Sequence, residues 1–529
     1  MANQAEAIAE TLVESGVEYV FGLPGGEIAT FIDACRRAGC RFLLTGHESS
    51  AAIMAQVLGQ ITGTPGVCAA TLGPGATNLV TGVANALLDR APLLAFTAQT
   101  ALCDIATLTH QRLALNVLFS SITKRSAVIG EADTVELVRE SLALALEPRP
   151  GPVQLSLPSD VALQAYSPAA QHEKGRTPPI EQRVPSKVDA IAARISASKR
   201  PLIVVGLGTP PVAASLVRTF VEKLGAPFLL TPKSKGIMPE DHPLFLGVAS
   251  GMALDSSIVE TARIADLVIG IGFDPVECDK TWFAQVEMVS LDSVSMQQGA
   301  YHPVESIGPI SDLVGQLTTL TPEARPWPDE ILTARRKAIF RSPQPSTHGV
   351  SPLALTEALR AIFPGNGVVT CDVGSHKLLF GQFWRSYQPG TFFMSNGLSG
   401  MGFGVPAAVA AQLAYPDRPV IAIVGDGGML MMAHDLVLIR ELNLPIVIAC
   451  LTDGSLSLIR LSQERRGFLP CGVDFHPPDF AALAEAFGIH SEKTPSIEGA
   501  QAALERALEE RRPTLLEVQV DFREYYDLL

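Results

Sequence analysis

The chain has 529 residues, of which 47% are hydrophobic and 18% are charged, and its formal net charge is −14. At roughly 150 residues per domain this length predicts about three globular domains, and the composition excludes a disordered chain. The acidic balance and the absence of a Lys/Arg run argue against nucleic acid as a partner. The eight cysteines are scattered without metal-ligand spacing, so we expect them to be reduced, as is usual in the cytoplasm.

The N-terminal stretch MANQAEAIAETLVESG predicts an acidic amphipathic helix rather than a signal peptide, because it has neither a basic nor an apolar segment. No apolar run reaches the ~18 residues that a membrane span needs. We therefore expect a cytoplasmic protein that does not use a membrane as a partner.

Two Pro-rich stretches, 166–186 and 321–349, are interpreted as linkers. They divide the chain into segments 1–165, 187–320 and 350–529. Within each segment short Val/Ile/Leu runs, such as EYVFGL, PLIVVGLG and RPVIAIVG, alternate with helical patterns. This alternation is typical of βαβ units, so the predicted fold class is α/β with three doubly wound parallel-sheet domains.

The first and third segments also resemble each other. Residues 73–100 and 402–428 both run from a glycine turn through a small-residue helix and Asp-Arg to an apolar strand. This weak repeat indicates two domains of one topology on either side of a different middle domain.

The middle segment contains PLIVVGLGTPP at 201–211, which fits a dinucleotide-binding fingerprint only in part. The third glycine is missing, and Pro210 and Pro211 crowd the turn. Asp292, after a later apolar run, could still face a ribose. We expect a Rossmann-like middle domain without tightly bound FAD.

Two acids follow predicted buried strands of the third segment. Asp426 lies between Gly425 and Gly427 after IAIV, and Asp453 follows LPIVIAC, with 25 residues between Gly427 and Asp453. Ligands of open α/β sheets bind at the carboxyl ends of the strands. Two converging carboxylates need a cation, and oxygen ligands favour Mg²⁺ completed by a phosphate, to which Gly427, Gly428 and the next helix could offer amides. The alternative is an ordinary turn, with Asp453 as an N-cap.

This segment resembles the motif of thiamine diphosphate (ThDP) dependent enzymes, in which Gly-Asp-Gly is followed downstream by Asn. The resemblance implies that Asp426, Asp453 and the carbonyl of Ser455 hold the Mg²⁺ that anchors the diphosphate of the cofactor. Asp453 departs from the usual Asn, which keeps an oxygen ligand but adds a negative charge beside the diphosphate.

The first segment is similar to the pyrimidine-binding domain of the acetolactate synthase-like branch of this family. The resemblance implies that Glu48 pairs with N1′ of the aminopyrimidine and so activates the cofactor. Gly25 and Gln111 match positions that line the substrate pocket, and Gln111 lies 13 residues before Lys124. Arg112 replaces the usual acid and is either an exposed arginine or a contact for a substrate carboxylate. The matching stretches are VFGLPGG (20–26), GHESSA (46–51), TLGPGATN (71–78) and NALLDRAPLLAFTAQ (85–99).

Further matches lie in CDVGSHKLLF (371–380) and SNGLSGMGFGVPAA (395–408). The resemblance implies that Met401 lies between the two rings of the cofactor and that His376 reaches the diphosphate, although Ser375 stands where a Gln is common. The cofactor-binding residues that it implies are Pro24, Glu48, Thr71, Asn78, Val373, Gly374, Ser375, His376, Ser399, Met401, Gly425, Asp426, Gly427, Gly428, Asp453, Ser455 and Leu456.

The resemblance therefore implies a ThDP- and Mg²⁺-dependent 2-oxo acid decarboxylase or carboligase with a small-molecule 2-oxo acid or carbonyl substrate. It also implies a homodimer or a dimer of dimers, with the cofactor between the first domain of one subunit and the third domain of its partner. Three alternatives remain. They are another lyase or transferase of the branch (2-hydroxyacyl-CoA lyase or sulfoacetaldehyde acetyltransferase type), a plain Mg²⁺-dependent phosphohydrolase, and a catalytically silent sensor with the same fold.

Overall fold

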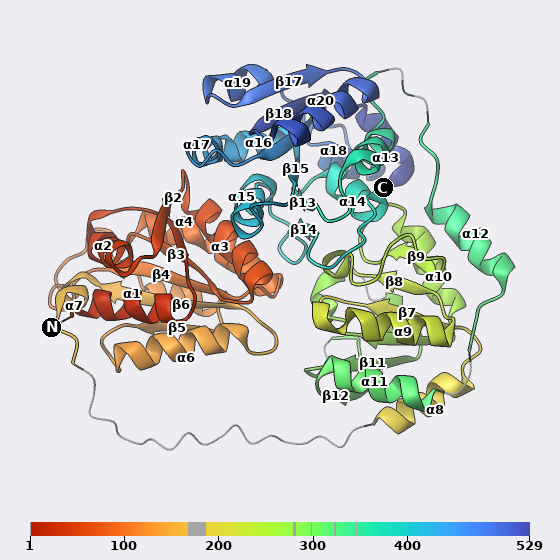
Figure 1. Cartoon of the computed structure of the whole chain (residues 1–529), viewed down its shortest axis with the longest axis horizontal. Helices are drawn as coiled ribbons and strands as arrows, with labels where there is room; N and C mark the ends of the chain where they lie inside the picture. Colours follow the sequence, from red (N-terminus) through yellow and green to blue (C-terminus); the bar gives the residue numbers. More distant parts are fainter. Residues whose placement is uncertain are drawn as a thin grey trace. The chain divides into compact units, whose positions relative to one another are not determined.

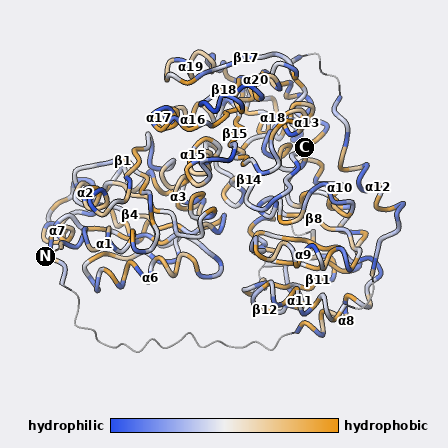
Figure 2. Tube along the Cα trace, in the orientation of Figure 1, coloured by the Kyte–Doolittle hydropathy of each residue, from blue (hydrophilic) through white to orange (hydrophobic). Residues whose placement is uncertain are grey.

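Three parallel six-stranded sheets, each flanked by helices, follow one another along the chain (Figure 1). The structure is a computed structural model that describes residues 2–167, 187–278, 282–297, 299–321, 324–344, 346 and 348–529. The apolar runs form buried strands, whereas the covering helices mix hydrophobic and hydrophilic residues (Figure 2). The predicted α/β class is confirmed, and all eight cysteines are free thiols.

The first sheet belongs to the N-terminal domain, and its neighbouring strands are all parallel. The strands are β1 (Tyr19–Leu23), β2 (Arg41–Leu44), β3 (Gly66–Ala70), β4 (Leu93–Gln99), β5 (Arg125–Val128) and β6 (Pro152–Pro158). The helices are α1 (Gln4–Glu14), η1 (Gly26–Ile28), α2 (Ala29–Ala38), α3 (Glu48–Thr62), α4 (Pro74–Leu88), α5 (Leu115–Ser120), α6 (Thr134–Leu146) and α7 (Ser159–Leu163).

The second sheet forms the middle domain. Its strands are β7 (Pro201–Val205), β8 (Phe228–Leu230), β9 (Phe245–Val248), β10 (Leu267–Ile271), β11 (Met288–Asp292) and β12 (Val304–Ile307). Its helices are α8 (Val188–Ala197), η2 (Pro211–Ala213), α9 (Ala214–Leu224), η3 (Pro232–Ser234), α10 (Asp255–Ile264), η4 (Pro275–Glu277), η5 (Trp282–Gln285) and α11 (Ile310–Leu320).

The third sheet carries the two acids. Its strands are β13 (Val368–Cys371), β14 (Phe392–Met394), β15 (Val420–Gly425), β16 (Ile446–Thr452), β17 (His490–Thr494) and β18 (Thr514–Gln519). The accompanying helices are α13 (Pro352–Ile362), α14 (Ser375–Phe383), α15 (Gly404–Ala414), α16 (Asp426–Met432), η6 (Ala433–Asp435), α17 (Leu436–Glu441), α18 (Ser457–Arg465), α19 (Phe480–Ala486), α20 (Ile497–Glu510), η7 (Phe522–Glu524) and α21 (Tyr525–Leu528).

The first and third sheets have the same strand order. The first runs β2-β1-β3-β4-β6-β5 and the third β14-β13-β15-β16-β18-β17, which is the same sequence when β13 is counted as the first strand. The middle sheet runs β12-β11-β10-β7-β8-β9, the order of dinucleotide-binding folds. This confirms the prediction of two like domains on either side of a different one.

The chain divides into two compact units. The first unit contains the first sheet and two segments from the C-terminal third of the chain, Gly397–Asp417 and Leu430–Leu444. Within this unit α15 packs on α3. The second unit contains the middle and third sheets, which share one continuous hydrophobic core.

The predicted linkers have different outcomes. Of the first, residues 168–186 lie outside the described part of the chain. The second prediction was wrong, because 321–349 includes α12 (Asp329–Ile339) and the buried Trp327, whose indole N–H donates to the carbonyl of Pro201 at 2.7 Å. Pro328 caps the helix, so a proline that we read as linker composition marks a helix start.

A buried ion pair joins the middle sheet to the third-domain chain within the second unit. The side chains of Lys235 and Glu240 are fully buried, with Nζ 2.7 Å from Oε2, and Nζ also donates to the carbonyl of Trp384 at 2.9 Å. Burial lowers the pKa of Lys235 and raises that of Glu240, while their contact acts against both shifts. Each charge therefore depends on the other.

Replacing one residue of the Lys235–Glu240 pair should lower the free energy of unfolding more than replacing both. Lys235→Met leaves a buried carboxylate without its cation and should lower the free energy of unfolding by about 3–5 kcal/mol. Lys235→Met combined with Glu240→Leu should lose less than that single change, which urea unfolding measures. A double variant that loses the sum of the two single losses would contradict this coupling.

Candidate functional site

The two predicted acids lie at one edge of the third sheet. Strand β15 ends at Gly425 and α16 begins directly with Asp426, so Gly425, Asp426 and Gly427 do not form a separate turn between the strand and the helix. Asp453 follows the end of β16, which pairs in parallel with β15 up to Gly425 and Leu451. Both carboxylates therefore occupy the carboxyl edge, where ligands of such sheets bind.

Asp426 is 3% exposed and holds the loop that bears the second acid. Its carboxylate accepts the backbone N–H groups of Gly427 at 2.8 Å, Asp453 at 3.1 Å and Gly454 at 2.8 Å. Burial nevertheless raises the pKa of Asp426. The three amides fix the carboxylate in place without removing the cost of its charge.

Asp453 is half-buried. Its carboxylate accepts the N–H of Ser455 at 3.0 Å and the hydroxyl of Ser457 at 2.5 Å. Burial, with the neighbouring Asp426 as a further cause, raises the pKa of Asp453 to about 7. A divalent cation would relieve both carboxylates, and Ser457 supplies a donor next to the acid that stands where Asn is usual. Ser457 was not among the predicted site residues, because its hydroxyl reaches Asp453 only through the fold of the intervening chain.

The chain after Asp453 contains the other predicted ligand positions. Ser455 is buried, and its hydroxyl donates to Asp474 at 2.8 Å. Leu456 immediately precedes α18, and its N–H donates to the carbonyl of Val473 at 2.7 Å. Among the described residues no group of three or more His, Cys, Asp or Glu side chains converges as a metal cluster.

A third acid, Asp372, lies beside the first turn of α16 and was missed in the sequence. Its carboxylate accepts the N–H of Val373 at 2.7 Å. A Cβ on Gly428 would collide with Oδ2 of Asp372, so only glycine fits between this acid and α16. The sequence feature that could have identified Asp372 is its place in CDVGSH, directly after β13, the strand that neighbours β15.

The start of α14 presents two buried polar atoms that have no partner. His376 is 6% and Ser375 5% exposed, and neither His376 Nε2 nor Ser375 Oγ has a hydrogen-bond partner among the described residues. Burial lowers the pKa of His376 to about 4, against a hydrogen bond from the ring to the carbonyl of Asp372. Gly374 precedes the helix and Gly425 adjoins the His376 ring. An anion such as a diphosphate would satisfy these atoms, so the residues fit the implied group.

In the first unit, Glu48 is a buried acid and not a surface one. It is the first residue of α3, it is 4% exposed, and its Oε2 accepts the amide of Asn78 at 2.9 Å. Its Oε1 lies 3.3 Å from where a Cβ of Gly75 would stand, at the start of α4. Glycine thus leaves the carboxylate room on that side.

The predicted substrate residues gather near the same helix start. A Cβ on Gly25 would collide with the side chain of Thr71, which follows β3. Gln111 has a left-handed backbone (φ 54°), and its Cβ lies 2.9 Å from where a Cβ of Gly73 would stand. Thr71 donates to Glu27 at 2.8 Å, a further acid that we did not single out. Pro24 is exposed between β1 and Gly25.

The structure also shows the surroundings of Arg112 and of the loop with Ser399 and Met401 that is predicted to bind the cofactor rings. The guanidinium of Arg112 donates to the carbonyl of Ile105, within its own exposed loop. Ser399 has a left-handed backbone (φ 55°), and Met401 is half-buried. The loop is anchored by Gly397, whose N–H donates to Asp89 at 2.9 Å. These residues and Glu48 belong to the first unit, whereas Asp426, Asp453 and His376 belong to the second.

Comparison with known proteins decides between the functions that the sequence analysis left open. Family models described as thiamine pyrophosphate enzyme N-terminal TPP binding, central and C-terminal TPP binding domains match residues 2–116, 188–319 and 372–518. An acetolactate synthase of Bacillus subtilis (strain 168) is 30% identical, with 99% of this chain and 94% of the relative covered. A probable acetolactate synthase large subunit of Methanocaldococcus jannaschii is 32% identical, with 98% and 92% covered. The large subunit of acetolactate synthase isozyme 2 of Escherichia coli K12 is 31% identical, with 98% and 96% covered.

The chain belongs to the thiamine pyrophosphate enzyme family. Its relatives place it in the acetolactate synthase-like branch, so the predicted resemblance is confirmed. It is a ThDP-dependent enzyme, which leaves no place for the plain phosphohydrolase or the silent sensor. Among the described residues no helix has the length and apolar character to cross a membrane.

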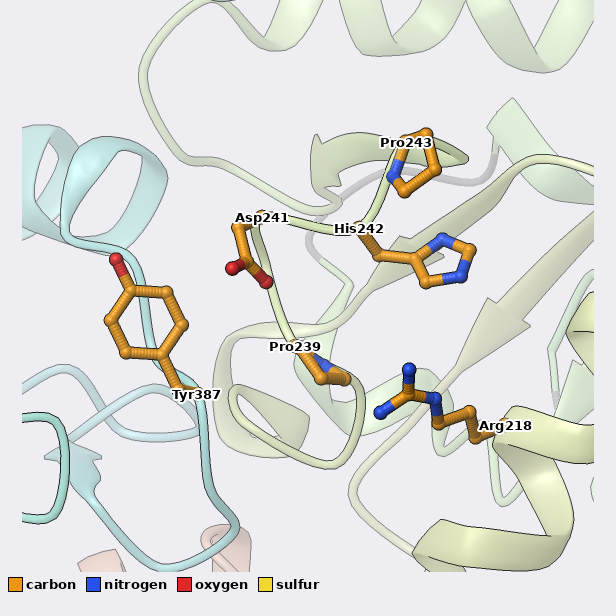
Figure 3. A pocket seen from close by; sticks show the side chains of 6 residues that line it. All are labelled: Arg218, Pro239, Asp241, His242, Pro243 and Tyr387. Carbon is orange, nitrogen blue, oxygen red and sulfur yellow. The ribbon is translucent and has the colours of Figure 1, made fainter.

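One surface depression of this ThDP enzyme contains none of the predicted residues. It measures about 410 Å³ and lies on the second unit (Figure 3). Its lining is Arg218, Pro239, Asp241, His242, Pro243 and Tyr387. Arg218 is engaged with Glu222 at 2.8 Å, and burial lowers the pKa of His242. The depression therefore contributes nothing to the candidate site.

His376 should make the cofactor-free enzyme less stable in acid. Its pKa is about 4 when folded and about 6.5 when unfolded, so between these values only the unfolded chain takes up the proton. Stability is unaffected above pH 6.5 and falls as the pH drops towards 4, by up to about 3 kcal/mol. His376→Gln should flatten this dependence in urea unfolding, whereas the exposed control His348→Gln should not. Parallel curves for wild type and His376→Gln would contradict the assignment.

Proposed function

We propose that the protein is a ThDP- and Mg²⁺-dependent enzyme that decarboxylates a 2-oxo acid, pyruvate in the first instance, and joins the remaining fragment to a second carbonyl. The observation that carries the proposal is the edge of the third sheet. The buried Asp426 and the half-buried Asp453, which need a cation, lie there. Ser375 Oγ and His376 Nε2, which have no hydrogen-bond partner among the described residues, lie at the start of α14. The names of the relatives, all acetolactate synthases, support the choice of pyruvate.

The residues divide the work between metal and phosphate. Asp426, Asp453 and the carbonyl of Ser455 would hold Mg²⁺, which prefers one or two carboxylates with phosphate oxygens completing its shell. Ser375 and His376 would meet the diphosphate, together with the amides at the start of α16. Because His376 Nε2 carries no proton in the neutral ring bonded to Asp372, it would gain one as it meets the anion.

Glu48 would act at the other end of the cofactor. The bound cofactor supplies a nucleophilic carbon that adds to a carbonyl and accepts the negative charge left when CO₂ departs. Glu48 would hold a proton between its carboxylate and N1′ of the pyrimidine, with Asn78 fixing its second oxygen. Ser399 and Met401 would support the pyrimidine, and Gly25 and Gln111 would border the acceptor.

The direct test of the activity is a substrate panel. The purified protein with ThDP and Mg²⁺ is given pyruvate and other 2-oxo acids, and CO₂ and products are followed by mass spectrometry. We expect CO₂ release from pyruvate and a carboligation product. Cleavage of 2-hydroxyacyl-CoA, or acetyl transfer from sulfoacetaldehyde, without action on any 2-oxo acid would favour the other members of the branch.

We further propose a homodimer, or a dimer of dimers, in the cytoplasm, with each cofactor between the first domain of one subunit and the third domain of its partner. The resemblance to the branch supports this arrangement.

Glu48→Gln should lower turnover by several orders of magnitude, because the amide cannot exchange a proton with the pyrimidine. Fold and ThDP binding should remain, as followed by circular dichroism and calorimetry. Glu10→Gln, an exposed acid on α1, is the matched control. Full turnover in Glu48→Gln would refute the role of Glu48.

Asp426→Ala should abolish Mg²⁺-dependent retention of ThDP, since it removes a ligand and the anchor of the Asp453 loop. Asp453→Asn should retain ThDP, because the amide oxygen still reaches the metal and one buried charge is gone. Titration calorimetry with and without Mg²⁺ measures both, with the exposed Asp417→Ala as control. Unaltered affinity in Asp426→Ala, or none in Asp453→Asn, would show that the metal site is misplaced.

Mixing two inactive variants tests the subunit arrangement. A dimer with one Glu48→Gln and one Asp426→Ala subunit has one fully intact site if each site uses both chains. After subunit exchange, about a quarter of the wild-type activity should return, because half of the dimers are mixed and each has one good site of two. No recovery in a mixture shown to exchange would mean that each site lies within one chain.

A further inference from the structure

The middle domain has the strand order of a dinucleotide-binding fold, with its switch point between β7 and β10. Dinucleotides bind such folds in the crevice outside this point, with the pyrophosphate against the loop after the first strand. In this chain the relevant loops are 206–210 after β7 and 272–278 after β10. What fills the space between them decides whether a nucleotide can enter.

Glycines close the two loops on each other. The N–H of Gly208 donates to the carbonyl of Gly272 at 2.8 Å, and that of Gly206 to Ile271 at 2.9 Å. A Cβ on Gly206 would stand 2.6 Å from the carbonyl oxygen of Gly272, and one on Gly272 (φ 59°) would collide with Thr209. The glycines thus bring two backbones together instead of leaving room for a pyrophosphate.

The carboxylate of Glu277, which is 3% exposed, occupies the donors around this point. Its Oε2 accepts the N–H of Leu207 at 3.0 Å and the hydroxyl of Thr231 at 2.5 Å, and its Oε1 accepts the N–H of Lys233 at 2.9 Å. These donors come from the loops after β7 and β8. Convergent backbone amides of this kind are what protein sites offer to phosphate oxygens.

Both oxygens of Glu277 accept hydrogen bonds, which matches the ionised carboxylate. Burial raises its pKa to about 7, and the three donors act in the opposite direction. Two further acids lie at this edge. Asp274 is 2% and Asp292 4% exposed, and Oδ2 of Asp292 lies 3.3 Å from where a Cβ of Gly208 would stand. These carboxylates would repel a polyanion placed beside them.

Residues of the third domain, in the same unit, lie against the turn that contains Glu277. The carbonyl of Glu277 accepts the amide of Asn396 at 3.3 Å, and Lys233 Nζ donates to the carbonyl of Met394 at 3.1 Å. Ser250 also donates to the Glu277 carbonyl. The edge that would face a nucleotide instead supports the chain between β14 and the predicted cofactor loop.

We propose that Glu277 is a built-in substitute for a nucleotide phosphate, so that the middle domain is closed to FAD and to other nucleotides and supports the residues after β14. This explains how a domain of nucleotide-binding topology serves an enzyme whose GLGTPP loop lacks the fingerprint.

Nucleotide binding by the whole enzyme is the first test. The ThDP- and Mg²⁺-loaded protein is titrated with FAD and with ADP in a calorimeter, and its flavin absorbance is recorded after purification. We expect no bound flavin, no heat above the adenosine control and no rise in activity on adding FAD. One FAD or ADP bound per chain with micromolar affinity would overturn the proposal.

Anion rescue is the second test. Glu277→Ala leaves three donors around a cavity, so sodium formate should raise its melting temperature, whereas sodium chloride at equal ionic strength should not. For wild type, and for Leu317→Ala, which opens an apolar cavity in the same domain, formate and chloride should have the same effect on the melting temperature. Absence of a formate-specific rise would overturn the anion role.

If Glu277→Ala does not fold, Glu277→Gln decides. Gln has nearly the same volume as Glu, but its side-chain NH₂ would face the N–H and O–H donors that surround the carboxylate. The melting temperature of this variant should therefore fall clearly below that of wild type. A melting temperature equal to that of wild type would overturn the proposal.

Discussion

The candidate site depends on two carboxylates at the ends of adjacent parallel strands, that of the buried Asp426 and that of the half-buried Asp453. Among the described residues no Lys, Arg or His side chain forms a salt bridge with Asp426 or Asp453, and burial raises the pKa of both carboxyl groups. A fold retains such an arrangement at a cost unless a ligand offsets it. The amides on Asp426 and the hydroxyl of Ser457 hold the geometry, and in the proposed function a divalent cation, bound together with a diphosphate, would supply the missing positive charge.

Buried polar groups that lack part of their hydrogen-bond partners also lie at the start of two other helices. Glu48 opens α3 as a buried acid with a single amide partner, and His376 lies in the first turn of α14 with a bare nitrogen. Polar groups buried without their full complement of partners are rare in folded proteins and cluster at functional sites. Here they lie in the domains that match the TPP binding models.

Strand ends were the part of the site that sequence could predict. An acid after an apolar run must lie at the carboxyl edge of a parallel sheet, so Asp426 and Asp453 could be placed before their surroundings were known. Glu27 and Ser457 could not, because their importance lies in contacts across turns and between strands, whereas Asp372 also follows an apolar run, at the end of β13, and was overlooked. The α12 helix was missed since its prolines read as linker composition, and α16 starts at the acid itself because Asp426 accepts the N–H of the next residue.

The closest test of the account is a crystal structure of the protein grown with ThDP and Mg²⁺. We predict one metal ion bound by the carboxylates of Asp426 and Asp453 and the carbonyl of Ser455, with the diphosphate against His376 and a pyrimidine against Glu48. A bound cofactor that leaves the two acids without a metal, or that turns its pyrimidine away from Glu48, would contradict the account.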